Sequence, residues 1–246
     1  MAIRKNLIEQ GVLGKEAHQQ NILVSKALTE AEKSKIANYS KGDVLLLNRD
    51  LRALNLKQGS YLEVKKIEAK QGKLLLQGDK KLLSLQLNKL GQFTKNLEIY
   101  RQGIREFRTG DKVLFTRSAK EQGVLNSVSG QISKITKSEI HLKTDSGQHL
   151  SFAKDANIMK HLEHAYAVTV HRAQGKTISN VIGIMESWRK NLTTQKSFYV
   201  TISRAQNKAT LITDNRQELA KSLAENTGYK LSALEHQNDK LMSKGR

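Results

Sequence analysis

The sequence predicts an α/β protein in which a parallel-sheet lobe is interrupted by two small inserted β-barrels. Three observations carry this prediction. Residues 1–38 and 158–246 alternate apolar strand-like runs with helical stretches, a pattern typical of parallel sheets. Residues 39–157 instead carry short β-like runs separated by glycine-containing turns. Within that stretch the same turn sequence occurs twice, which indicates an internal repeat.

The N-terminal segment, residues 1–38, is expected to form a helix, a strand and a second helix. Apolar residues recur at near-helical spacing between residues 2 and 13. The apolar run 22–24 predicts a buried strand, which we expect to join the parallel sheet of the C-terminal segment. Thr29, followed by acidic residues, predicts the N-cap of a helix that extends to about residue 39.

The central segment is expected to form two tandem barrels of five strands, at residues 39–97 and 98–157, because closure hides strand edges. The expected strands are 44–47, 61–67, 73–77, 82–87, 113–117, 131–135, 139–143 and 148–152. Three sequence matches relate the two barrels: Gly42-Asp43 with Gly110-Asp111, residues 54–59 with residues 125–130, and Lys66-Ile67 with Lys134-Ile135. The alternative is one larger sheet with chance Gly-Asp turns.

Residues 158–246 are expected to supply the rest of the parallel sheet. The expected strands are 165–170, 181–185, 198–202 and 209–213, and the expected helical stretches are 172–174, 201–206 and 217–224. Strands that alternate with short helices favour parallel pairing.

Composition limits the class of protein. The 246 residues include 42 Lys and Arg against 23 Asp and Glu, a formal net charge of +19 that is spread along the chain and favours a polyanionic partner. The absence of cysteine excludes disulfides, thiolate metal sites and cysteine nucleophiles. No apolar run approaches the ~20 residues of a membrane helix, so we expect a cytoplasmic protein that does not insert into membranes.

Residues 175–177 read Gly-Lys-Thr, the ending of a phosphate-binding loop, but the rest of that loop is missing. The motif needs a glycine five residues before Gly175, where this chain has Val170. We therefore expect that the chain alone does not bind and hydrolyse ATP.

The C-terminal segment resembles a different group of proteins. Residues 166–177 (YAVTVHRAQGKT) resemble the fifth motif of superfamily 1 helicases, and residues 198–205 (FYVTISRA) resemble the sixth. Residues 110–126 resemble the small barrel of RecD-like enzymes, which is of the Src-homology-3 type. The opening residues 3–14 and residues 213–216 are most similar to conjugative relaxase–helicases of the TraI family. The resemblance implies a RecA-like second motor lobe, formed by residues 1–38 and 158–246, with both barrels inserted.

The resemblance also implies roles for single residues. Arg204 would be the arginine finger that reaches ATP held by the other lobe, with a surface arginine as the plain alternative. Gln174 and Gly175 would lie near the ATP cleft. Thr169 and His171 would contact single-stranded DNA phosphates, the alternatives being an ordinary strand residue and a structural histidine.

Two further groups of residues are weaker candidates. His161 and His164, with Glu163 nearby, have metal-ligating side chains but no third convergent ligand in the sequence, so no metal site is predicted. Trp188 with Arg189-Lys190 could stack a base beside a phosphate, although a packing role explains the tryptophan equally well.

Three hypotheses for function follow. The first is the second motor lobe of a relaxase–helicase, inactive alone, whose longer polypeptide would use ATP and Mg²⁺, single-stranded DNA, a first helicase lobe and a relaxase domain in plasmid transfer. The second is a vestigial helicase region that serves as a translocation signal for type IV secretion, with a coupling protein as partner and entry into the recipient cell. The third is a free-standing basic protein that binds nucleic acid.

Overall fold

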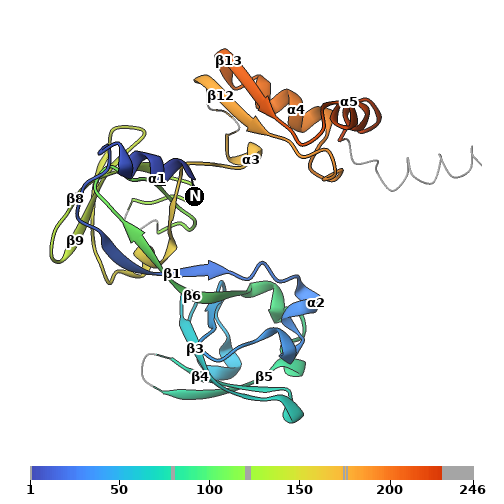
Figure 1. Ribbon diagram of the computed structural model, residues 1–246. Helices are drawn as coiled ribbons and strands as arrows, with labels where there is room; N and C mark the ends of the chain where they lie inside the picture. The colour runs from blue at the N-terminus through green and yellow to red at the C-terminus, as the bar shows by residue number, and fades with distance from the viewer. Residues whose placement is uncertain (1, 79–80, 120–122, 174, 176, 229–246) are drawn as a thin grey trace, which may run out of the picture. The chain divides into compact units, whose positions relative to one another are not determined.

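The computed structural model describes residues 2–78, 81–119, 123–173, 175 and 177–228 (Figure 1). These residues form two compact units, one that ends at Tyr166 and one that begins at Ala167. Each unit has its own sheet structure and is described separately below. None of the described helices is long and apolar enough to cross a membrane.

The described residues of the first unit form two antiparallel sheets. In the first sheet the strand order is β1-β6-β2-β3-β4-β5, and in the second it is β10-β9-β8-β7-β11. The strands of the first sheet are β1 (His18–Ser25), β2 (Val44–Leu47), β3 (Tyr61–Glu68), β4 (Lys73–Gln77), β5 (Leu82–Gln86) and β6 (Leu97–Phe107). Those of the second are β7 (Lys112–Phe115), β8 (Ser129–Ile135), β9 (Glu139–Thr144), β10 (His149–Ala153) and β11 (Leu162–His164). All eight strands expected in the central segment are present.

Both sheets are open in the described residues, so the expected closed barrels are not confirmed. β5 and β1 end the first sheet, and β10 and β11 end the second, with no pairing between the ends. The first sheet also has one strand more than the second, because β1 pairs with the long strand β6.

Strand β1 corrects one expectation about the N-terminal segment. Its residues pair antiparallel with β6, for example Ile22 with Gly103, so the run 22–24 does not join a parallel sheet. The two helices of this segment are present but short: α1 is Ala2–Glu9, and α2 is Glu30–Lys33. Thr29 caps α2 in a capping box with Glu32, as expected, but the helix ends after one turn.

The internal repeat is supported by matching backbone hydrogen bonds. The amide of Gly42 donates to Val64 O, and the amide of Gly110 donates to Ile132 O, both at 2.8 Å. Both glycines have a positive φ, +89° and +91°, which favours glycine there. Strands β3 and β8 each carry a bulge, and in each the bulge comes directly before the matched lysine, Lys66 or Lys134.

One of the three sequence matches is out of register. The amide of Gly59 donates to Leu47 O, and the amide of Ser127, not of Gly130, donates to the equivalent Phe115 O. Ser127 has the same left-handed backbone as Gly59, with φ values of +70° and +83°. The match of residues 54–59 with 125–130 is therefore displaced by three positions, because a serine fills the place of the glycine.

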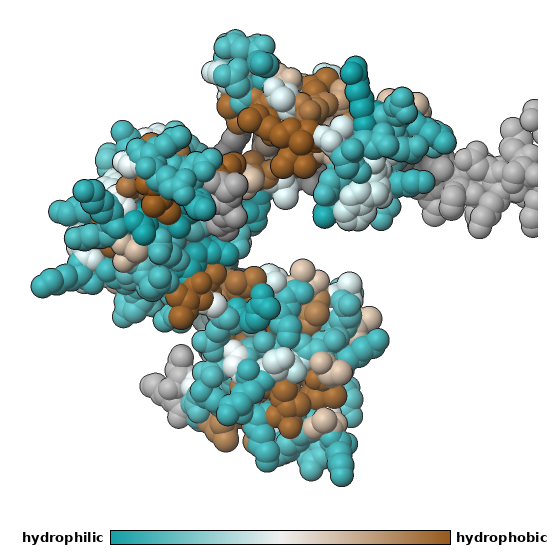
Figure 2. Space-filling model, viewed as in Figure 1, coloured by the Kyte–Doolittle hydropathy of each residue, from teal (hydrophilic) through white to brown (hydrophobic). Residues whose placement is uncertain are grey.

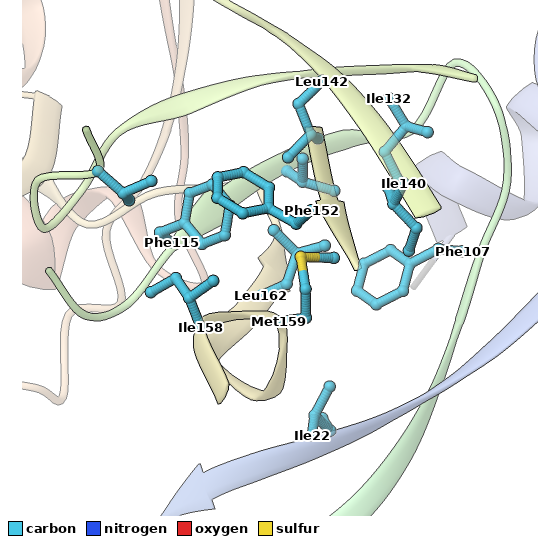
Figure 3. Close-up of a cluster of buried hydrophobic side chains, with 12 residues drawn as sticks. Ile22, Phe107, Phe115, Ile132, Ile140, Leu142, Phe152, Ile158, Met159 and Leu162 are labelled. Carbon is cyan, nitrogen blue, oxygen red and sulfur yellow. The ribbon is translucent and has the colours of Figure 1, made fainter. Parts of the chain in front are cut away.

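Each repeat has its own core. β2 is buried along its whole length, with Leu45 and Leu47 in the first core and Leu46 in a small cluster with Tyr100. Figure 3 shows the second core, where Phe115, Phe152 and the other labelled side chains converge. Ile22 of β1 belongs to this second core, so the N-terminal strand is tied to the second repeat as well as to β6.

In its described residues the second unit has two parallel strands and three helices. Its elements are α3 (Val170–Ala173), β12 (Ile178–Ile184), α4 (Gln195–Ile202), β13 (Ala205–Ile212) and α5 (Arg216–Glu225). β12 and β13 pair in parallel, as expected. The predictions of strands at 165–170 and 198–202 are wrong, because α3 begins at residue 170 and α4 covers residues 198–202. The helix expected at 201–206 is also wrong, because β13 begins at Ala205.

Close packing holds α4 against β12. A Cβ added at Gly183 would lie 2.6 Å from Thr201 Cγ2 and 2.9 Å from Leu211 Cδ2, so a side chain at this position does not fit. The helix begins at a capping box formed by Thr194 and Ser197. This cap and the close approach at Gly183 explain why a β-prone sequence such as 198–202 is helical.

Candidate functional site

The two helicase-like sequence segments meet at the amino ends of β12 and β13. Ile178, the first residue of β12, pairs with Ala205, the first residue of β13. The amide of Ile178 also donates a 2.9 Å hydrogen bond to Arg204 O. α3 contacts α4. The fold of the second unit therefore brings α3 next to α4, and Ile178 next to Arg204.

Arg204 lies between α4 and β13, not beyond a strand as the sequence suggested. Its Nε donates to Val200 O at 3.3 Å, and its Nη2 donates to Ser203 Oγ at 3.1 Å. Both partners are neutral. Among the described residues no carboxylate forms an ion pair with Arg204, so its charge is not neutralised within this part of the chain.

The other predicted site residues lie before β12. Thr169 precedes α3, where its Oγ1 accepts a 3.4 Å hydrogen bond from the amide of Arg172, so it is not a strand residue. His171 lies within α3. Gly175 has φ +82°, a backbone conformation that favours glycine. Gln174 lies outside the described residues.

The opposite, carboxyl edge of the two strands holds a polar contact that sequence reasoning missed. Asp214 accepts hydrogen bonds from the amide of Ser187 at 2.7 Å and from its hydroxyl at 2.8 Å. These bonds lower the pKa of Asp214 to about 2. The contact joins the segments that follow β12 and β13. In the sequence, this edge is marked by the polar run Thr213-Asp214-Asn215 between β13 and α5, with Asn215 as the N-cap of α5.

One face of β12 and β13 carries isoleucines that are exposed among the described residues, beside the polar Asn180, Lys208 and Thr210. Ile182 and Ile184 are 70% and 73% exposed, and Ile212 is 52% exposed. Figure 2 shows apolar residues gathered over these strands. Parallel strands normally have both faces covered, so the second unit presents a sheet face of the kind that other elements bury.

Trp188 lies in the loop after β12 and is 64% exposed. The Arg189 guanidinium lies over its ring, 4.7 Å from the ring centroid. Trp188 is therefore not a core anchor, and its indole is held against an arginine at the surface.

His161 and His164 are internal residues of the first unit. His161 Nε2 lies 2.9 Å from the Tyr61 hydroxyl, and burial lowers the pKa of His161 to about 4. His164 Nε2 lies 3.1 Å from Glu106 O, and burial lowers its pKa as well. No group of three or more metal-ligating side chains occurs in the part of the chain that the structure describes.

The repeated Gly-Asp turn anchors the N-terminal segment twice. Asp43 is paired with Lys26 at 2.7 Å, and Asp111 with Arg4 at 2.8 Å. Burial alone would raise the pKa of Asp111. Hydrogen bonds from Arg4 and from the Tyr166 hydroxyl outweigh this effect, so the pKa lies below its usual value. These aspartates are structural, and their repetition reflects the duplicated turn.

Comparison with known proteins places these motifs in a family context. Residues 164–212 match the model of the UvrD-like helicase C-terminal domain. The multifunctional conjugation protein TraI of Escherichia coli strain K12 is 25% identical over 212 residues, which cover 84% of this chain and 11% of TraI. A probable conjugal transfer protein TraA of Sinorhizobium fredii is 28% identical over 80 residues, 32% of this chain and 7% of TraA. The chain is a homologue of these conjugation proteins.

The homology to TraI covers both units, whereas the helicase model covers only the last residues of the first unit and most of the second. The chain spans about a tenth of the length of TraI. Among solved structures, Pif1 helicase from Bacteroides in complex with ADP-AlF3 and single-stranded DNA is 19% identical, with a TM-score of 0.38, over 58% of this chain and 35% of Pif1. The Candida albicans Pif1 helicase is 12% identical, with a TM-score of 0.24, over 98% of this chain and 47% of Pif1.

Proposed function

We propose that this chain forms part of the second motor lobe of a conjugative relaxase–helicase. The single observation that carries the proposal is the match of residues 164–212 to the UvrD-like helicase C-terminal domain within a chain related to TraI. The meeting of both helicase-like segments at the amino ends of β12 and β13 supports it. In the longer polypeptide the lobe would couple ATP hydrolysis to movement along single-stranded DNA.

Arg204 is the proposed arginine finger. Among the described residues the Arg204 guanidinium is held by a carbonyl and a hydroxyl and not by a carboxylate, and its forked donors suit the charge that develops on a transferring phosphate. ATP and Mg²⁺ would be held mainly by a first lobe, with Gln174 and Gly175 near the same cleft. Release of the guanidinium from Val200 and Ser203 would accompany closure of that cleft.

Thr169 and His171 are the proposed contacts to single-stranded DNA. Hydroxyl and imidazole groups donate hydrogen bonds to phosphate oxygens, and both residues lie at or in α3. Thr169→Ala in this chain is expected to weaken binding of an oligothymidine several-fold. Unchanged affinity would remove Thr169 from the DNA site.

The uncovered apolar face of β12 and β13 supports placement of the chain within a larger lobe. α4 packs on one face of the two parallel strands, whereas the other face carries exposed isoleucines, and parallel sheets normally have both faces covered. Further strands and helices of the longer polypeptide would cover this face. The first helicase lobe and the relaxase domain would be partners within the same polypeptide.

The test of the motor role uses a chimera in which residues 1–246 replace the matching region of the E. coli TraI protein. Arg204→Ala is expected to lower DNA-stimulated ATP turnover by about 10³-fold or more, with little change in KM for ATP. The control is Arg216→Ala, an exposed arginine after the opposite ends of the strands. Equal turnover for both variants would contradict the finger role. ATP turnover by the 246-residue chain alone, abolished in Arg204→Ala, would contradict the need for a first lobe.

A second candidate role is a translocation signal that a type IV coupling protein recognises. It is favoured by the first unit, which has its own two cores and lies almost wholly outside the helicase match. Residues 1–246 fused to a reporter are expected to carry it into recipient cells in this case. Absence of transfer, with the fusion intact in donor cells, would remove this role.

A further inference from the structure

We infer that the outer face of β8, β9 and β10 is a second binding surface for single-stranded DNA, separate from the site at α3. A hollow of about 310 Å³ lies on this face. Its polar lining comprises Ser133, Lys134, His141, His149 and Ser151. The inference rests on the proposed interaction with single-stranded DNA and extends it to the second repeat.

Strand pairing sets the polar side chains of this face in two rows. Lys134, His141 and Ser151 are directly paired across the three strands, and Gln131, Lys143 and His149 form the neighbouring row. The alternate residues of β9, Ile140 and Leu142, point to the other side and belong to the core. Ammonium, imidazole, amide and hydroxyl groups thus share one side of the sheet, and all of them can donate hydrogen bonds to phosphate oxygens.

The first repeat provides an internal comparison, because its strands β3, β4 and β5 have the same pairing. The row Lys66, Leu75 and Ser84 takes the place of Lys134, His141 and Ser151. The row Glu63, Gln77 and Leu82 takes the place of Gln131, Lys143 and His149. The same scaffold therefore carries two leucines and a glutamate where the second repeat carries two histidines and a neutral glutamine.

The charges also differ in how they are compensated. In the first repeat Lys65 pairs with Glu63 at 2.8 Å, and Lys66 pairs with Glu68 at 3.2 Å. In the second repeat, within the described residues, no carboxylate lies within ion-pair distance of Lys134 or Lys143. On this face His141 has an acidic neighbour, Glu139, at 3.6 Å. The outer face of β8, β9 and β10 thus keeps positive charge without an acidic partner among the described residues, and such a surface suits the phosphates of a DNA strand.

Single-stranded DNA fits this face better than a duplex. The hollow is of the size of a small-ligand site, large enough for about one nucleotide. Imidazole rings can stack on unpaired bases while lysines contact the adjoining phosphates, and this combination is typical of single-strand binding surfaces.

The experiment exchanges the two faces. The variant His141→Leu/Lys143→Gln/His149→Leu gives the second repeat the residues of the first, and Leu75→His/Gln77→Lys/Leu82→His does the reverse. Because all six side chains lie on outer faces, both variants should retain the wild-type circular dichroism and thermal midpoint. Binding of fluorescein-labelled oligothymidine to the full 246-residue chain is measured by anisotropy at several salt concentrations.

The first variant is expected to bind oligothymidine roughly tenfold more weakly, and its salt dependence should fall by about 0.7 in log–log slope for each phosphate that is no longer neutralised. The reverse variant should bind more tightly than wild type. Unchanged affinity and slope in the first variant would overturn the inference. Thr169→Ala separates the two sites: weaker binding in that variant, with wild-type binding in the first, overturns this inference but leaves the proposed function standing.

Discussion

The two units of this chain bury their apolar residues in very different ways. Nearly all of the buried hydrophobic side chains among the described residues belong to the first unit; the exceptions are Met185 and Leu219. The second unit leaves Ile182, Ile184 and Ile212 exposed on one sheet face. The comparison teaches that the unit with helicase-like motifs leaves one sheet face available to a partner layer, whereas the duplicated unit has the cores of a self-contained fold.

The largest expected effect tests the core of the first unit. Phe107→Ala removes a fully buried ring from the second core and should lower the free energy of unfolding by about 4 kcal/mol. Ile104→Ala, on the same strand but 70% exposed, is the control and should change it by less than about 0.5 kcal/mol. Urea unfolding followed by circular dichroism measures both. Similar destabilisation in the two variants would mean that β6 does not pack as described.

Acid should weaken the first unit selectively. The folded-state pKa of His161, about 4, lies below the ordinary histidine value of 6.5, so the unfolded state binds the additional proton between these values. The contribution of neutral His161 to the free energy of unfolding should therefore be complete above about pH 6.5, and the free energy should fall by roughly 3 kcal/mol as the pH drops towards 4. His161→Gln should flatten this part of the profile. A wild-type stability that is constant over this range would contradict a buried neutral imidazole.

The paired aspartate of the second repeat gives a further test. Asp111→Ala removes a fully buried carboxylate and leaves the partly buried Arg4 without its main partner, so we expect the first unit to be destabilised by about 3 kcal/mol. Asp214→Ala in the second unit removes a carboxylate that is exposed, so thermal unfolding should shift much less. Differential scanning calorimetry distinguishes the two. A larger effect at Asp214 would reverse the proposed ranking of the units.

The smallest effect is expected on the uncovered face. Ile182→Ser/Ile184→Ser should change the stability of this chain by less than about 0.5 kcal/mol, because both side chains are already exposed. In the TraI chimera the same change should lower the free energy of unfolding several-fold more, because the face would be covered there. Urea unfolding of both proteins measures the difference. Equal small effects in both settings would argue against a covering layer.

The sequence predicted the central strands well because turns and alternation are local signals. Gly42-Asp43 and Gly110-Asp111 mark the same turn, and their positive φ values favour the glycine. β6 was not predicted, since residues 101–105 carry Arg101, Gln102 and Arg105, and this part of the strand is held by pairing with β1. Closure of the barrels was an inference from edge protection, and the described sheets remain open.

The sequence identified the residues of the candidate site, but it did not predict the secondary structure that holds them. The run 198–202 contains aromatic and β-branched residues and so resembles a strand, but capping at Thr194 and packing on Gly183 make it a helix. Arg204 consequently follows a helix. The contact of Asp214 with Ser187 joins residues far apart in the sequence and depends on the pairing of β12 with β13. Such contacts are not readable from a single sequence.

Amide hydrogen exchange on the 246-residue chain tests most directly whether the helicase-like unit is an incomplete layer. We expect the slowest exchange in β2, β3, β8 and β9, which carry the two cores, and at least ~100-fold faster exchange in β12 and β13. In the TraI chimera the amides of β12 and β13 should become protected. Equal protection of both units in the chain alone would contradict the account.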